Sequence, residues 1–401
     1  MNALRKQLDK IKPAFEKGGK LEAFHTAFDA FETFLFVPNT TSKRGVHVHD
    51  AIDSKRTMIM VIFALMPALF FGMYNLGYQH YLALGLEAGF WEKFFYGLLS
   101  MLPQIVVSYV VALGIEFVLA SRKGHEVAEG VLVTGMLIPM IIPVETPLWM
   151  IAVATAFAVV FAKEVFGGTG YNVFNVALVT RAFLFFSYPA AMSGDSVWVR
   201  LGKSFGLGGE GTVVDSFTGA TPLAQIAAAK GEVPVIHDAL GQPLSYLDAF
   251  LGFIPGSIGE TSTLAILIGA LFLIFTGIAS YKIMLSGVAG VVTMASIFNA
   301  FGTTIAMQTT PLQHLLFGGF AFGIVFMATD PVTAARTETG KWIYGFFIGV
   351  MAVFIRVLNA GYAEGMMLAI LFMNMMAPLI DYMVVERNTQ KRLARALKSK
   401  A

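Results

Sequence analysis

The strongest constraint on this chain is a series of ten apolar segments, each close to the length of about 20 residues that crosses the hydrocarbon core of a bilayer. The first five lie near 57–75, 94–120, 127–144, 147–166 and 174–192, and the second five near 262–281, 283–300, 313–329, 340–358 and 363–382. Only 13% of the residues are charged, whereas a soluble domain has about 25%. We therefore predict an all-α polytopic membrane protein with about ten transmembrane helices.

The distribution of Lys and Arg predicts how these helices are oriented, because short cytoplasmic loops carry an excess of both. If the two termini are cytoplasmic, 23 of the 28 basic residues fall on that side, including Lys163 and Arg181 at the turn between the fourth and fifth segments. The five left outside are Lys93, Arg200, Lys203, Lys230 and Arg356. This bias predicts a multi-pass protein of a bacterial inner membrane with both termini in the cytoplasm.

The one long connection divides the chain into two halves of five segments. An odd number of spans per half gives the halves opposite orientations in the membrane, which is the arrangement of an inverted repeat. The expected domains are a cytoplasmic amphipathic arm at 1–56 that lies on membrane lipid, a first five-helix half at 57–192, a periplasmic loop at 193–260, a second five-helix half at 261–382 and a basic cytoplasmic tail at 383–401.

Composition excludes several classes of chemistry. The chain has no cysteine, so it has no disulfide, no thiolate ligand for an iron–sulfur cluster and no thiol nucleophile, and electron transfer requires an organic cofactor. Its seven His are scattered without metal-ligand spacing, and we expect no metal centre. The net charge of +2 leaves no basic face once the loops are assigned, so a nucleic-acid partner is not expected.

The most specific motif lies in the predicted periplasmic loop and reads Asp215-Ser216-Phe217-Thr218-Gly219-Ala220-Thr221. It presents a hydroxyl nucleophile on an accessible loop beside small residues that let a modifying enzyme approach. An ordinary turn is the alternative, with Thr221 as the N-cap of a helix that begins at Pro222.

This motif resembles the flavinylation motif of the sodium-pumping NADH:quinone reductases and the related Rnf complexes, in which a flavin transferase attaches FMN to the last Thr as a phosphoester. The resemblance implies that Thr221 carries covalent FMN. It also implies that Asp215, Thr218, Gly219 and Ala220 belong to the attachment site.

The resemblance to the B subunits of the sodium-translocating NADH:quinone oxidoreductases covers the whole chain. The blocks that carry it include Phe15-Glu-Lys-Gly-Gly-Lys20, Lys163-Glu-Val-Phe-Gly-Gly-Thr-Gly170, Arg181-Ala-Phe-Leu-Phe-Phe186 and Met327-Ala-Thr-Asp-Pro331. It implies a six-subunit complex that passes electrons from NADH toward quinone and exports sodium, with a second, noncovalent flavin, riboflavin, in this chain. The alternative within the family is the Rnf subunit, which serves ferredoxin and NAD and generally lacks a polar arm like 1–55.

Two glycine-rich segments are further candidates for flavin contact. They contain Gly256, Ser257 and Gly259 before the sixth segment, and Gly168, Gly170 and Asn172, flanked by Arg181, between the fourth and fifth. Amides at a helix N-terminus bind phosphate oxygens, and irregular backbone within a membrane protein lines cavities. The alternatives are a glycine-rich helix cap, a turn satisfied by its own Asn side chains, and a structural ion pair at Arg181.

Acids within apolar spans are candidates for binding an ion, because an unpaired charge there costs several kcal/mol. Glu116, Asp330 and Asp381 lie in such positions, and the resemblance implies that they are candidates for sodium uptake. Alternatively, they cap helices or pair with Arg122, Arg336 or Arg387. A plain ion or solute transporter is the alternative from a different functional class, since inverted repeats with intramembrane acids are common there. The flavinylation motif argues against it, because a passive channel has no use for a covalent flavin.

A quinone site needs an aromatic slot and polar groups near the two carbonyls of the ring. The resemblance implies such a pocket where the arm at 1–56 meets the cytoplasmic ends of the spans. The candidate walls are His125, Glu126, Phe183 and Phe185.

Overall fold

The structure is a computed structural model that describes residues 2–15, 54–123, 130–195, 197–209, 211–215, 217–229, 235–359 and 364–398, together with Gly361 and isolated positions between 19 and 45. Within these residues every regular element is a helix, which confirms the predicted all-α class. Up to residue 192 the elements are α1 (Asn2–Ile11), η1 (Lys12–Ala14), α3 (Ser54–Ala83), α4 (Phe90–Lys123), α5 (Gly130–Ile141), α6 (Leu148–Phe157), η3 (Ala158–Glu164), α7 (Val176–Ser187) and α8 (Pro189–Met192). Beyond it they are α9 (Pro222–Ala228), α10 (Tyr246–Leu251), α11 (Thr263–Phe275), α12 (Tyr281–Phe301), η4 (Ile305–Gln308), α13 (Pro311–Leu316), α14 (Phe320–Phe322), η5 (Gly323–Met327), α15 (Glu338–Leu358) and α16 (Met366–Lys398).

In the described part of the chain, six helices are long and apolar enough to cross a membrane: α3, α4, α6 continued through η3, α12, α15 and α16. The prediction of full-length spans is wrong for α5, α7 and α11, which have 12, 12 and 13 residues. At 1.5 Å per residue they extend roughly 18–20 Å, well short of a core about 30 Å thick. Asn175 and Ser262 set where α7 and α11 begin, because each side chain accepts a hydrogen bond from the backbone N–H three residues later.

The predicted span at 313–329 is not a single helix either. After α13 the chain turns at Gly318 and Gly319, whose φ angles of +67° and +66° are left-handed and favour glycine, and it resumes as α14 and the π-helix η5. The guanidinium of buried Arg356 donates to the carbonyl oxygens of Phe317 (3.0 Å) and Gly318 (2.8 Å). These carbonyls at the end of α13 have no partner within the helix, so Arg356 stabilises the break.

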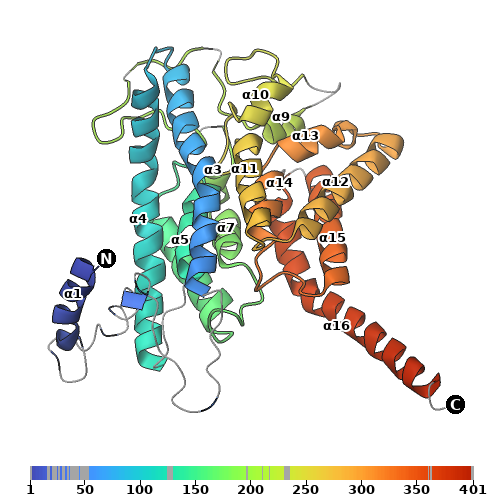
Figure 1. The fold of residues 1–401 in the computed structure, drawn as a ribbon. Helices are drawn as coiled ribbons and strands as arrows, with labels where there is room; N and C mark the ends of the chain where they lie inside the picture. Colours follow the sequence, from blue (N-terminus) through green and yellow to red (C-terminus); the bar gives the residue numbers. More distant parts are fainter. Residues whose placement is uncertain are drawn as a thin grey trace.

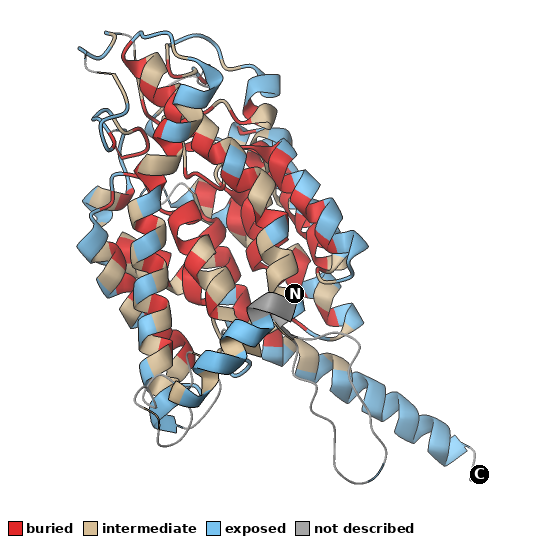
Figure 2. Ribbon diagram, turned by 60° about the vertical axis from the view of Figure 1, so that its left-hand side comes forward, coloured by how far each residue is buried: buried red, intermediate tan, exposed pale blue. Residues whose placement is uncertain are grey.

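The two ends of the membrane region lie at the same end of the bundle. Figure 1 shows the beginning of α3 and the end of α16 at its lower end, and α9, α10 and α13 at the opposite end. α16 continues as one helix to Lys398, past the predicted boundary at 382, and its last part projects from the bundle. Figure 2 shows buried residues inside the bundle and exposed ones on the outer helix faces. Those faces carry side chains such as Phe275 (86% exposed), as expected of a lipid-facing surface.

Helices α12 and α15 pack closely through glycines. A Cβ atom added at Gly290 of α12 would lie closer than 3.0 Å to the carbonyl oxygen of Phe346, and one at Gly349 of α15 would lie equally close to the carbonyl oxygen of Gly287. Small residues at such positions let two backbones approach, and van der Waals packing then drives helix association in the membrane.

We expect Gly290→Ala to lower the stability of the protein by about 1–3 kcal/mol, because overpacking forces the two backbones apart. The matched control is Gly114→Ala in α4, where no described residue outside the surrounding helix turns lies within 4 Å of the added methyl group. The control should be neutral or up to about 1 kcal/mol more stable, since Ala is favoured over Gly within helices. Thermal unfolding in detergent measures both variants, and equal effects would contradict the close packing.

Candidate functional site

Thr221 lies at the beginning of α9, where its Oγ1 atom accepts a hydrogen bond from the N–H of Ala224 (3.2 Å). The side chain is therefore a helix N-cap before Pro222, which was the structural alternative for this motif. This hydrogen bond uses the oxygen only as an acceptor, and an ester oxygen keeps that capacity. Helix capping and a phosphoester at the same half-buried oxygen are consequently compatible.

The residues before Thr221 are held by close backbone contacts. The N–H of Thr218 donates to the carbonyl of Ala239 (2.9 Å), and the Oγ1 of Thr218 accepts from the N–H of Ala220 (3.2 Å). A Cβ at Gly219 would lie closer than 3.0 Å to the carbonyl oxygen of Asp195, so glycine is needed there. Asp215 is exposed and accessible to a modifying enzyme.

A small cavity of about 20 Å³, here called the Thr221 cavity, joins two segments that were predicted separately: the flavinylation motif and the glycine-rich segment before α11. Gly256 and Ser257 line it together with Thr221. The Oγ1 atom of Thr261 is buried in its wall and has no hydrogen-bond partner in the described structure, so it is available to a polar ligand. Gly259 is explained by packing, because a Cβ there would lie 2.8 Å from the ring of Phe322.

Arg181 is part of the same region. Its predicted position at a cytoplasmic turn is wrong, because it lies in the middle of α7 with 6% of its side chain exposed. Its Nη1 donates to the Oε1 of Glu260 (2.6 Å), and its Nη2 forms an ion pair with Glu364. Both acids line the Thr221 cavity. Sequence reasoning missed their role, although an acid at the start of the last predicted span, 363–382, was the available signal at Glu364.

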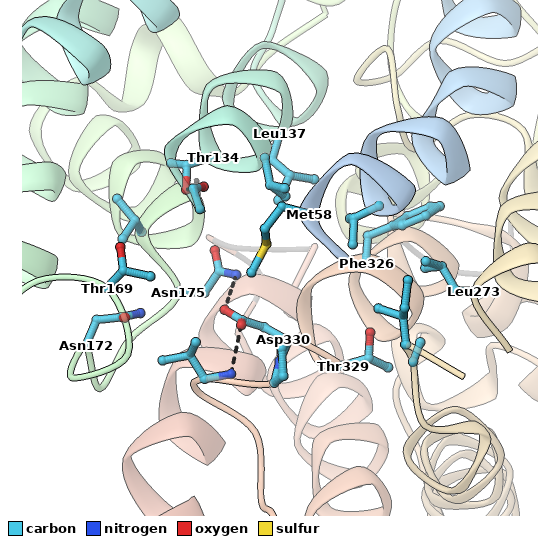
Figure 3. A pocket seen from close by; sticks show the side chains of 18 of the residues that line it. Met58, Thr134, Leu137, Thr169, Asn172, Asn175, Leu273, Phe326, Thr329 and Asp330 are labelled. Carbon is cyan, nitrogen blue, oxygen red and sulfur yellow. Dashed lines mark hydrogen bonds between the residues drawn. The ribbon is translucent and has the colours of Figure 1, made fainter. Parts of the chain in front are cut away.

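A second cavity of about 80 Å³, the Asp330 cavity, lies between α3, α5, α11 and the segment after η5 (Figure 3). The Nδ2 of Asn175 donates to the Oδ2 of Asp330 (3.3 Å), and the N–H of Val332 donates to its Oδ1 (3.0 Å). Apolar side chains, among them Leu137 and Phe326, form other parts of the wall. The cavity is therefore polar on one side and apolar on the other.

The glycine-rich segment predicted between the fourth and fifth spans borders this cavity. Gly168 and Gly170 have φ angles of +96° and +95°, which favour glycine, and they place Thr169 and Asn172 in the wall. The side chain of Asn172 accepts from the N–H of Gly170 (3.3 Å) and donates to the carbonyl of Phe174 (3.1 Å), so it satisfies part of the loop itself. The Oγ1 of Thr169 is buried without a partner in the described structure.

The three acids predicted for sodium lie in different places. Buried Glu116 pairs with Lys163 of the π-helix η3 rather than with Arg122. Asp381 caps α15 by accepting from the N–H groups of Arg336 (2.7 Å) and Thr337 (3.0 Å). Only Asp330 lines either of the two cavities described above. Among the described residues, no group of three or more His, Asp or Glu could hold a metal ion.

Two of the four residues predicted to form the wall of a quinone pocket, Phe183 and Phe185, lie within the described residues. The ring of Phe183 contacts Phe157, with centroids 4.7 Å apart, and also Tyr188. Phe185 packs partly buried against the core. His125 and Glu126 lie outside the described residues, so this pocket stays a prediction.

The Arg181 cluster generates a pH-dependent prediction. Burial raises the pKa of Glu364 from 4.5 to about 7, because Arg181 offsets only part of the cost of a buried charge. A raised pKa stabilises the protein below about pH 4.5, and this contribution is lost as the pH rises through about 7. Glu364→Gln should flatten this decline by on the order of 1 kcal/mol, measured as Tm against pH. The exposed Glu87→Gln is the control, and a wild-type pH profile in Glu364→Gln would contradict the assignment.

Comparisons with known proteins agree with this architecture. Residues 41–390 match the model of the NQR2, RnfD, RnfE family. The chain is 46% identical to the B subunit of the Na(+)-translocating NADH-quinone reductase of Pseudomonas paraeruginosa strain PA7, over 98% of this chain and 99% of the relative. It is 45% identical to the corresponding B subunit of Neisseria meningitidis serogroup B and 44% identical to that of Klebsiella pneumoniae, with the same coverage. The chain therefore belongs to the NQR2, RnfD, RnfE family.

Proposed function

We propose that this chain is the B subunit of a sodium-translocating NADH:quinone oxidoreductase and carries FMN on Thr221. The main support is the match to B subunits of this enzyme along 98% of the chain, which includes most of the N-terminal arm. FMN supplies the electron-transfer chemistry that a chain without cysteine cannot supply itself. The implied setting is a bacterial inner membrane, with both termini cytoplasmic. The implied partners are the other subunits of a six-subunit complex, quinone, sodium and a flavin transferase.

The residues around Thr221 suit the attachment of a flavin phosphate. The Oγ1 of Thr221 would attack the FMN phosphorus of FAD, the bond from that phosphorus to the AMP part would break, and AMP would leave together with the hydroxyl proton. The unpaired hydroxyl of Thr261 in the adjoining wall could then donate to a phosphate oxygen. Among the described residues, an added Cβ at Gly256 would meet just the Cγ2 of Thr261, at 3.5 Å, so this part of the loop leaves space beside the attachment atom.

The same proposal places the second flavin, riboflavin, in the Asp330 cavity. An isoalloxazine ring needs polar groups at its pyrimidine edge and apolar contacts along its faces. The unpaired hydroxyl of Thr169 and the amide of Asn172 would serve the edge, and Leu137 and Phe326 the faces. Riboflavin has no phosphate, so a cluster of cations is not required.

The construction of the two cavities favours the predicted inverted repeat. The Asp330 cavity uses the start of α5, the loop before α7 and the segment after η5. The Thr221 cavity is lined by Gly318 and Gly319 before α14 and by Glu364 before α16. The N–H of Gly259, in the glycine-rich segment that borders this cavity, donates to the carbonyl of Met140 near the end of α5 (2.8 Å). These are corresponding positions in two halves of five segments, so each half would hold one flavin.

The proposal also includes a sodium site and a quinone pocket. Asp330 is the candidate we retain for sodium uptake, because it alone of the three acids lines one of these cavities. The quinone pocket is proposed where the arm at 1–56 meets the spans. An Rnf-type role is less well supported than the role of a B subunit, since the compared relatives also align with the arm. A plain transporter would not need the flavinylation motif.

Covalent flavin is tested by fluorescence of the denatured chain on a gel, after expression with an active flavin transferase. Thr221→Ala should abolish the fluorescence, because it removes the only proposed attachment oxygen. The matched control is Thr310→Ala, since Thr310 is also a helix N-cap followed by Pro. Fluorescence that persists in Thr221→Ala, or disappears equally in Thr310→Ala, would contradict attachment at Thr221.

The second flavin is tested by filling the Asp330 cavity. Thr134→Phe should release the noncovalent flavin and leave the covalent flavin in place, because Thr134 lines the Asp330 cavity and not the Thr221 cavity. Flavin in the supernatant after acid precipitation measures the noncovalent fraction. Val110→Phe adds the same bulk on a 65% exposed position of α4 and should have no effect. Full retention in Thr134→Phe would place riboflavin elsewhere.

A further inference from the structure

A groove of about 510 Å³ runs between α15 and α16 on the outer face of the bundle and shares no residue with the two cavities. Ile343 and Phe347 line it from α15, and Phe372, Met376 and Met383 from α16. These positions recur at helical spacing, so each helix presents one continuous apolar stripe. Phe347 is 45% exposed and Met383 is 58% exposed, so the described part of the chain leaves the stripe uncovered.

One end of the groove is basic. Arg387 and Lys391 line it there, and because they are four residues apart on α16 they lie on the same helix face. Thr339 and Asn388 add hydrogen-bonding groups at this end. Among the described residues that line the groove, none is acidic. This end therefore fits an anion.

The dimensions of the groove match one leaflet of a bilayer. At 1.5 Å per residue, the apolar stripe from Phe372 to Val384 extends about 18 Å, and one leaflet contributes about 15 Å of hydrocarbon. Arg387 and Lys391 lie roughly 5 and 10 Å further along the helix, at the depth of lipid phosphates.

We propose that this groove is a binding site for an anionic phospholipid. One acyl chain lies along the apolar stripe, and the phosphate accepts hydrogen bonds from Arg387 and Lys391. Basic pockets at the ends of transmembrane helices bind anionic headgroups in this way. An uncharged quinone would fill the stripe but would leave two cations without a counter-charge. This proposal does not depend on the flavin sites.

The test uses the purified complex, delipidated in detergent and supplied with phosphatidylglycerol or phosphatidylethanolamine, with bound lipid counted by native mass spectrometry. Arg387→Gln/Lys391→Gln should weaken phosphatidylglycerol binding by roughly tenfold or more. The matched control, Arg392→Gln/Arg395→Gln, removes the same charge from the same helix outside the groove. Met376→Trp should also reduce binding, because it fills the stripe while both cations remain. Equal binding in the wild type and the Arg387/Lys391 variant would overturn the proposal.

A second experiment asks whether a protein helix occupies the groove instead. The chain has no cysteine, so Met383→Cys introduces a single reporter thiol. In the assembled complex this thiol should react with a lipid-soluble maleimide at the rate of a lipid-facing control, Val110→Cys. Protection of the thiol, together with a cross-link to another protein of the complex, would show a protein occupant and overturn the proposal.

Discussion

The ion pairs of Arg181 join three segments of the chain beside Thr221. The guanidinium projects from α7 and binds Glu260 before α11 and Glu364 before α16, two acids that line the Thr221 cavity. Glu260 also accepts from the hydroxyl of Ser257 (2.7 Å). Its carboxylate comes so close to Gly319 that no side chain fits there. Removing Arg181 would take the counter-charge away from both acids, and breaking a buried ion pair in this way costs about 3–5 kcal/mol. The shape of the Thr221 cavity therefore depends on this cluster.

Irregular backbone in the bundle is stabilised by long polar side chains from neighbouring helices. In a membrane protein, non-helical backbone needs partners within the protein. Arg356 supplies them for the break after α13, and Gln104 donates to the carbonyls of Pro143 (3.0 Å) and Val144 (2.9 Å) after α5. Asn75 donates to the carbonyl of Ile254 (3.0 Å) beside the Thr221 cavity. The two cavities lie next to such breaks, which links short and broken spans to the space that ligands would occupy.

The sequence predicted which segments are helical better than it predicted the lengths and breaks of the helices. All ten apolar segments correspond to helical regions, because hydropathy reports burial in lipid or protein. It cannot report where a helix ends inside an apolar run, as at Ile142-Pro143-Val144 after α5 or at Gly318-Gly319. Arg181 was misplaced for a related reason: charge counting assigns a cation to the nearest loop, whereas two acids distant in sequence neutralise this one within the bundle. Glu116 and Lys163 are 47 residues apart, so no local pattern joins them.

The candidate site was predictable where a local motif exists and not where it depends on tertiary contacts. Thr221 was found from its motif, and the segment at 255–262 from its glycines, but only the fold shows that they line one cavity. Peptide mass mapping of the native complex is the most direct test of covalent FMN on Thr221. Trypsin releases the peptide from Ser204 to Lys230. If Thr221 carries FMN, this peptide gains the mass of FMN less one water, and fragmentation localises the added mass to Thr221. An unmodified peptide from an active complex, or the added mass on another residue, would contradict it.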